Sequence, residues 1–217
     1  VVFSATGAGA AEPCGKKLYP IYNDAFNMGW INKGIGTSRL VESGYPLAPD
    51  SDGKSLVFQI RAGQDGDKAA GGVTDGIMPC LDVDNSALQF WLIPYSTDDK
   101  WSIGLTCWGL DVRSNAADYI GGFSAIYVPI ADYADISEDT LNKWQLVTIP
   151  LSDIEKKGIF DKYLDTQMTE FDWYRVSGIY ITGTNRGYKK QTDIAAFNDI
   201  NIIRYLKEPT EIDITET

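Results

Sequence analysis

The dominant pattern in this chain is a strict alternation of apolar and polar residues over short segments. Turns rich in Gly, Asp and Ser separate these segments. A period of two is typical of strands that bury one face. The segments predicted as strands are 56–61, 88–93, 101–108, 123–128, 144–149, 176–182 and 197–205.

Helical periodicity is nearly absent from the sequence. Only residues 152–158 predict one or two helical turns, with Ser152 as the N-cap and Gly158 as the end. Many short strands with almost no helix predict an all-β fold, a single antiparallel two-sheet β-sandwich.

One face of three central strands is apolar and predicts the core. Its residues are Leu56, Phe58, Ile60, Leu88, Phe90, Leu92, Ile103, Leu105 and Cys107. We interpret Trp144 and Trp173 as structural, because Trp144 opens a strand whose inward set is Val147, Ile149 and Leu151.

The opposite face of the same strands combines flat rings with amide and guanidinium donors, which are what sugars require. If these strands are neighbours in one sheet, Trp91 and Trp108 stack on pyranose rings there. The predicted hydrogen-bonding partners for hydroxyls are Gln59, Arg61 and Gln89, and further contributors at the same face are Tyr127 and Tyr180. The alternative is that a loop covers the rings and they form a second small core.

Two acidic residues interrupt strand patterns near the two ends of the predicted domain. Asp24 follows Ile21-Tyr22, and Asp199 lies inside the last strand. An Asp in such a position is disfavoured and needs a partner. A cation bound between the first and last strands would supply one.

Composition narrows the choice of partner. The net charge of −11 argues against nucleic acid and anionic membranes, which both require a basic patch. The chain contains no histidine, which excludes His-based triads and the usual zinc sites. The three cysteines, Cys14, Cys80 and Cys107, form no metal-like cluster, and they allow either one disulfide with a free thiol or three buried thiols.

The two ends of the chain have the composition of linkers. Residues 1–16 are Ala/Gly-rich and predict a flexible arm, and residues 207–217 are acidic and Thr-rich. We therefore expect a β-sandwich over 17–206, joined covalently to neighbouring modules of a larger protein.

An ordered set of short motifs resembles a known family. The motifs are Ile21-Tyr22-Asn23-Asp24-Ala25, Gly29-Trp30, Gly53-Lys54-Ser55-Leu56, Leu88-Gln89-Phe90-Trp91, Lys143-Trp144-Gln145-Leu146-Val147-Thr148-Ile149-Pro150-Leu151, Ile179-Tyr180-Ile181 and Phe197-Asn198-Asp199-Ile200. Over residues 18–206 this set resembles the jelly-roll carbohydrate-binding modules, which are ancillary domains of secreted plant-polysaccharide-degrading enzymes and cellulosomes.

The resemblance implies a monomeric, extracellular module that binds a polysaccharide without catalysis. The expected ligand is a plant cell-wall β-glucan such as cellulose or xyloglucan, and binding would bring an attached enzyme or cell-surface protein to its substrate. The resemblance also implies a structural calcium ion, whose ligands would be Asp24 and Asp199, with Glu42 and Asn198 as further candidates.

Two other functions stay open at this point. An adhesive or structural β-sandwich could bind a protein partner through the same rings. A glycoside hydrolase needs only two carboxylates, but no Glu stands among the aromatic residues of the predicted non-core face.

Overall fold

The computed structural model describes residues 17–25, 31–36, 38–49, 51–74, 78, 81–97, 100–108, 123–163 and 169–205. The two predicted linkers, and also Cys14 and Cys80, lie outside these residues. Within them, no helix is long and apolar enough to cross a membrane.

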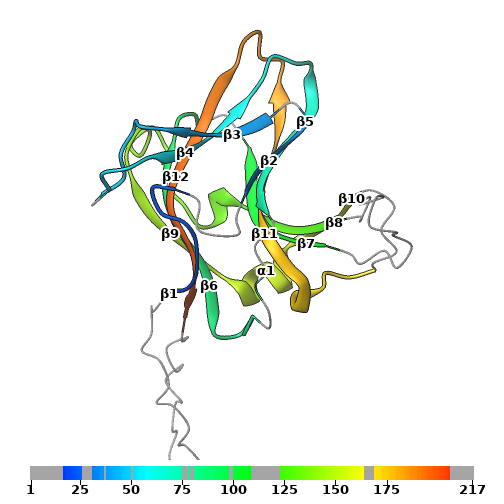
Figure 1. The fold of residues 1–217 in the computed structure, drawn as a ribbon. Coiled ribbons are helices and arrows are strands. Elements are labelled where there is room, and N and C mark those ends of the chain that lie inside the picture. Colours follow the sequence, from blue (N-terminus) through cyan, green and yellow to red (C-terminus); the bar gives the residue numbers. More distant parts are fainter. Residues whose placement is uncertain are drawn as a thin grey trace, which may run out of the picture.

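The described strands form two antiparallel sheets, as predicted (Figure 1). Sheet A consists of β1 (Lys17–Tyr22), β3 (Ser38–Ser43), β4 (Ser55–Ile60), β6 (Ser86–Pro94), β9 (Gln145–Pro150) and β12 (Thr192–Arg204). Sheet B consists of β2 (Ile31–Gly36), β5 (Asp65–Thr74), β7 (Trp101–Trp108), β8 (Phe123–Pro129), β10 (Ile159–Tyr163) and β11 (Val176–Arg186). Sheet A lies on the left of Figure 1 and sheet B on the right.

The strand orders place distant segments side by side. Sheet A has the order β3-β4-β12-β6-β9, with β1 also paired to β12. Sheet B has the order β10-β8-β7-β11-β5-β2. The chain therefore changes sheet between β6 and β7, although these two strands follow each other in sequence. This change decides which predicted site residues can meet.

The predicted helical segment is the short helix α1 (Leu151–Lys157). The prediction of Ser152 as its N-cap is wrong. Pro150, the last residue of β9, precedes the helix, and no side chain caps it. The predicted end is confirmed, because the Gly158 N–H donates to the Ile154 carbonyl at 2.9 Å. Two 3-10 turns, η1 (Ile130–Asp132) and η2 (Trp173–Arg175), also occur.

The inner faces of the two sheets form the main core. All nine predicted core residues of the three central strands are buried. Phe197 of β12 lies at the centre, with its ring centroid 5.7 Å from that of Phe90 and 5.5 Å from that of Trp101. Trp173 packs edge-on against Phe171 beside this core, so its structural interpretation is confirmed.

Replacing Phe197 should show how much the fold depends on this contact. Phe197→Ala removes a fully buried ring and should lower the free energy of unfolding by about 3–5 kcal/mol, as large-to-small core substitutions do. Ile159→Ala, at a residue that is 53% exposed, is the matched control and should change stability by less than about 0.5 kcal/mol. Urea unfolding measures both. Equal effects of the two variants would contradict this description of the core.

Candidate functional site

The predicted sugar-binding residues lie on two different outer faces. Sheet A carries Gln59, Gln89 and Trp91, whereas the strands of sheet B carry Trp108, Tyr127 and Tyr180. The sheets pack through their inner faces, so their outer faces point in opposite directions. The prediction of one shared face is wrong, because the pairing of β7 with β8 and β11 puts it in the other sheet from β4 and β6.

Arg61 was predicted on the strand face beside Gln59, but β4 ends at Ile60 and Arg61 follows it as an exposed residue. Its carbonyl accepts a 2.9 Å hydrogen bond from Asn185 Nδ2. The side chain of Trp108 lies outside the described part of the structure, although its backbone belongs to β7.

On the outer side of sheet B, two tyrosines form a cluster that we call the tyrosine face. Tyr127 and Tyr180 point outward because their neighbours in β8 and β11 enter the core. Their ring centroids are 5.8 Å apart with an interplanar angle of 37°. Ala70 and Ala125 pack beside them. Tyr180 is fully buried, as are the two alanines, whereas Tyr127 is half-buried. The face therefore presents one accessible ring, that of Tyr127, which a buried second ring holds in place.

Gly104 explains how the two rings come together. It lies between Tyr127 and Tyr180 in the sheet and pairs with both. A Cβ added at Gly104 would lie 1.9 Å from the Ile126 carbonyl oxygen. Only glycine allows this close approach of β7 and β8. It also leaves the floor flat between the two tyrosines.

An ion pair crosses the tyrosine face. Lys68 on β5 contacts Asp161 on β10, although three strands lie between them in the sheet. In a flat sheet four strand spacings would separate them by about 19 Å, farther than the two side chains reach together. Sheet B must therefore curve toward its outer side, in agreement with the bend between β5 and β8 in Figure 1.

The polar groups of this face are those of a hydrogen-bonding site. Burial, and next the Asp161 carboxylate, raise the pKa of the Tyr127 hydroxyl, which therefore stays protonated at neutral pH. The Thr106 hydroxyl is buried at this face without a hydrogen-bond partner in the described structure. A buried hydroxyl normally has a partner. Because the Thr106 oxygen is itself shielded from solvent, the polar groups that a ligand can reach are those of the half-buried Tyr127 and of the Lys68–Asp161 pair.

The outer face of sheet A also carries a covered cluster. Val57, Ile93 and Ala196 form a small buried cluster there, against which Trp144 and Tyr95 pack. The Trp144 Nε1–H donates to the Leu47 carbonyl of the loop after β3. The loop after β3, Trp144 and Tyr95 thus form a second small core at this end of the sheet. This is the alternative to sugar binding that the sequence analysis left open for aromatic residues.

Trp144 packs in the protein, as its structural interpretation expects, but against the small cluster. It lies on the outer face of sheet A, outside the main core. The alternation itself contained this information, since Trp144 is in phase with the exposed Leu146 and out of phase with the buried Val147. The predicted amides of this face already have protein partners, with Gln59 bonded to Asp193 and Gln89 to Thr148. Trp91 is half-buried on the same face.

Three of the four predicted metal residues, Asp24, Asn198 and Asp199, lie at the junction of β1 and β12, where the Asn198 side chain joins them. Its Oδ1 accepts the backbone N–H of Asp24 at 3.2 Å and that of Asp199 at 2.7 Å. Its Nδ2 donates to Asp24 Oδ1 at 2.9 Å and to Ser51 Oγ at 3.2 Å. Both aspartates adopt positive φ angles, 58° and 49°. The side-chain oxygen and nitrogen of Asn198 thus each form two hydrogen bonds within the protein, and these bonds hold the junction together.

These contacts limit how a calcium ion could bind. With two N–H groups on its oxygen, the Asn198 side chain does not fit the role of a ligand. Glu42 forms an ion pair with Lys54 at 3.6 Å. Among the described residues no three acidic, histidine or cysteine side chains gather as a metal group. Calcium also accepts carbonyl and water oxygens, so a site anchored by Asp24 and Asp199 stays a prediction.

Comparison with known proteins identifies the fold. No protein-family model and no curated protein gives a significant match to the chain. Among solved structures, two of family 30 carbohydrate-binding modules are similar. One has 19% identity and a TM-score of 0.57 over 86% of this chain and 98% of the other, and the second has 17% identity and a TM-score of 0.58 over 90% and 92%. The chain has the jelly-roll fold of carbohydrate-binding modules.

A third similar structure is of a family 11 module from Clostridium thermocellum, in complex with a β-1,3-1,4-mixed-linked tetrasaccharide. It shares 11% identity with this chain, covers 90% of it and 99% of its own length, and has a TM-score of 0.53. The predicted jelly-roll fold is therefore confirmed.

Thermal unfolding tests the predicted calcium site. A bound ion stabilises the folded state by mass action, so millimolar calcium should raise the Tm and a chelator should lower it. Asn198→Asp should enlarge the response, because it places a third carboxylate beside Asp24 and Asp199. If the Tm of the unmodified protein is indifferent to both calcium and chelator, the predicted site is absent.

Proposed function

We propose that this protein is a non-catalytic carbohydrate-binding module whose binding site is the tyrosine face. The observation that carries the proposal is the half-buried ring of Tyr127, which packs against the fully buried ring of Tyr180 on the curved side of sheet B. Rings of this kind stack on the C–H faces of pyranoses. The curvature lets a polymer contact several strands at once.

The polar groups around the rings support the same ligand class. The Tyr127 hydroxyl and the Lys68–Asp161 pair can exchange hydrogen bonds with sugar hydroxyls. The two charged side chains are 43% and 26% exposed, and a pair of this kind contributes at most about 1 kcal/mol. A ligand can therefore displace it at little cost.

The substrate class that fits best is a neutral plant β-glucan, such as cellulose, xyloglucan or a mixed-linkage glucan. The net charge of −11 disfavours polyanionic ligands. The similar family 11 module is in complex with a β-1,3-1,4-mixed-linked tetrasaccharide, and its fold is shared here. We further propose that the module is monomeric and extracellular, and that it targets a covalently attached enzyme or cell-surface protein to the polysaccharide.

The same observations support two other functions less well. A glycoside hydrolase needs a pair of carboxylates across its site. Among the described residues of the tyrosine face, Asp161 is the one carboxylate, and it is paired with Lys68. A purely protein-binding surface would not require a curved face with an ion pair across it.

Removal of one ring tests the proposal. Tyr127→Ala should weaken binding to soluble β-glucans in affinity electrophoresis by about 1–3 kcal/mol, as for aromatic hot spots, which is roughly 5- to 150-fold. Tyr127→Phe should bind nearly as well, because stacking is retained. Tyr174→Ala removes a ring that is 78% exposed elsewhere and is the control. Unchanged binding by a folded Tyr127→Ala protein would place the site elsewhere.

The salt dependence tests the charge of the ligand. A neutral glycan releases no counterions, so the affinity for β-glucan should be the same at low and high ionic strength. A uronic-acid polymer should bind weakly throughout. A steep loss of affinity with added salt, measured by calorimetry, would show that an anionic polysaccharide is the ligand.

A further inference from the structure

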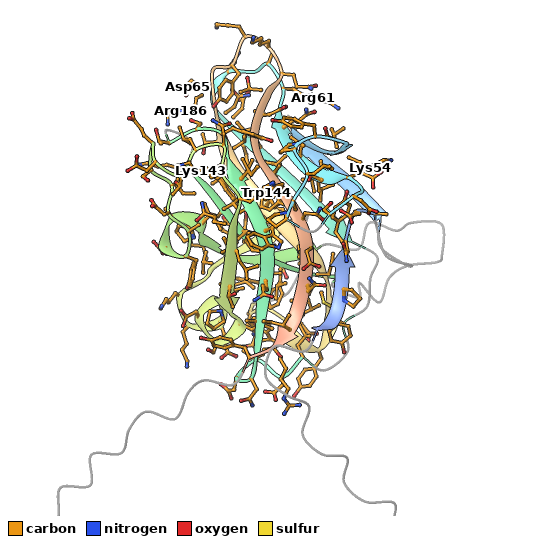
Figure 2. The ribbon with its side chains drawn as sticks, turned by 90° about the vertical axis from the view of Figure 1, so that its left-hand side faces the viewer. Lys54, Arg61, Asp65, Lys143, Trp144 and Arg186 are labelled. Carbon is orange, nitrogen blue, oxygen red and sulfur yellow. The ribbon has the colours of Figure 1, made fainter. Side chains whose placement is uncertain are left out.

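Three aromatic residues that the proposed site does not use lie together on the outer face of sheet A. We call Tyr45, Tyr95 and Trp144 the ring patch. Tyr95 and Trp144 are half-buried against the small apolar cluster outside the core. Tyr45 is 82% exposed. Figure 2 shows Trp144 near the middle of this face.

The exposed tyrosine is held by an ordered loop. Ser43 Oγ donates to the Tyr45 carbonyl at 2.6 Å and accepts from the Tyr45 N–H at 3.2 Å. Ser55 Oγ donates to the Pro46 carbonyl, and Trp144 Nε1 donates to the Leu47 carbonyl. The Tyr45 ring is therefore exposed but fixed at its backbone. Such pre-organisation lowers the entropy that is lost on binding.

Hydrogen-bonding groups border the patch. Gln59 Nε2 donates to Asp193 Oδ1 at 2.6 Å, which orients both side chains. Burial, and then Asp193 and Tyr45, raise the pKa of Tyr95 to about 12, so its hydroxyl is neutral and can donate. Rings and oriented polar groups thus stand together here as they do on the tyrosine face.

We propose that the ring patch is a second glycan-binding site, which takes a short segment of a neutral polysaccharide chain. The choice of glycan as ligand rests on the proposed function of the tyrosine face. The ring patch is a separate surface from the tyrosine face, because the outer faces of sheets A and B point in opposite directions. The two sites cannot contact the same sugar residue.

The size of the patch favours a glycan over a protein partner. A stable protein interface buries about 800 Å² on each partner. A single aromatic side chain buries only about 150–250 Å², and two of the three rings already lie half-buried against the module itself. What remains is enough for a few pyranose rings.

The arrangement has a consequence that one site alone would not have. Two glycan sites on opposite faces allow one module to bind two chains, or two distant segments of one chain. Binding to a long polymer then becomes tighter than to an oligosaccharide, because the second contact is intramolecular. A bivalent module also cross-links soluble polysaccharide.

Calorimetric stoichiometry with a mixed-linkage tetrasaccharide tests the proposal. The unmodified protein should bind two equivalents. Tyr45→Ala and Tyr127→Ala should each leave one, and the double variant should leave none. Tyr174→Ala, at a tyrosine of similar exposure, should keep both. The Tyr45 substitution removes an exposed ring, so the fold should survive it. With long soluble β-glucan, only the unmodified protein and Tyr174→Ala should increase light scattering.

The outcomes separate the two proposals. One equivalent for the unmodified protein, retained by Tyr45→Ala and lost in Tyr127→Ala, overturns the second site and leaves the tyrosine face intact. Loss of one equivalent in Tyr45→Ala but none in Tyr127→Ala supports the ring patch and contradicts the tyrosine face. A protein partner that is lost with Tyr45 while both variants bind sugar as before also overturns the second site. Absence of binding to every β-glucan contradicts both.

Discussion

The antiparallel pairing of β12 is the interaction on which the rest of the structure depends. β6 follows one edge of this strand, while β4 and then β1 share the other. Its inward residue Phe197 contacts both Phe90 and Trp101, so the strand also joins the two sheets. Asn198 lies where the pairing of β12 with β4 gives way to its pairing with β1, and the Asn198 amide stabilises this change of partner. One strand thus fixes sheet A, the core and the junction of the chain ends.

The alternation of inward and outward side chains along the strands gives each sheet an outer face with its own set of side chains. Sheet B curves, since Lys68 and Asp161 meet across it, and Gly104 and the alanines keep its floor low around two tyrosines. On sheet A, the loop after β3 and Trp144 cover a small apolar cluster. The ring of Tyr45 stays exposed and that of Tyr95 half-buried. The fold is shared with carbohydrate-binding modules, but these side chains decide what this chain can bind.

The sequence predicted the strands that alternate clearly, and the structure has β7 over the predicted residues 101–108. It did not predict β5, whose Gly-rich and Asp-rich segment has low strand propensity and pairs because β2 and β11 flank it. Inward and outward positions were readable from the period of two. Sheet membership was not, because it depends on pairings between distant segments such as β6 and β12. The predicted site was therefore divided between two faces.

Amide chemical-shift mapping is the measurement that tests the central claim most directly. In a titration with a mixed-linkage β-glucan oligosaccharide, the largest shifts should occur in β7, β8 and β11 around Gly104, Tyr127 and Tyr180. Those strands are neighbours in sheet B and form the floor under the two rings. Shifts that leave these strands unchanged and cluster elsewhere on the module would contradict the account.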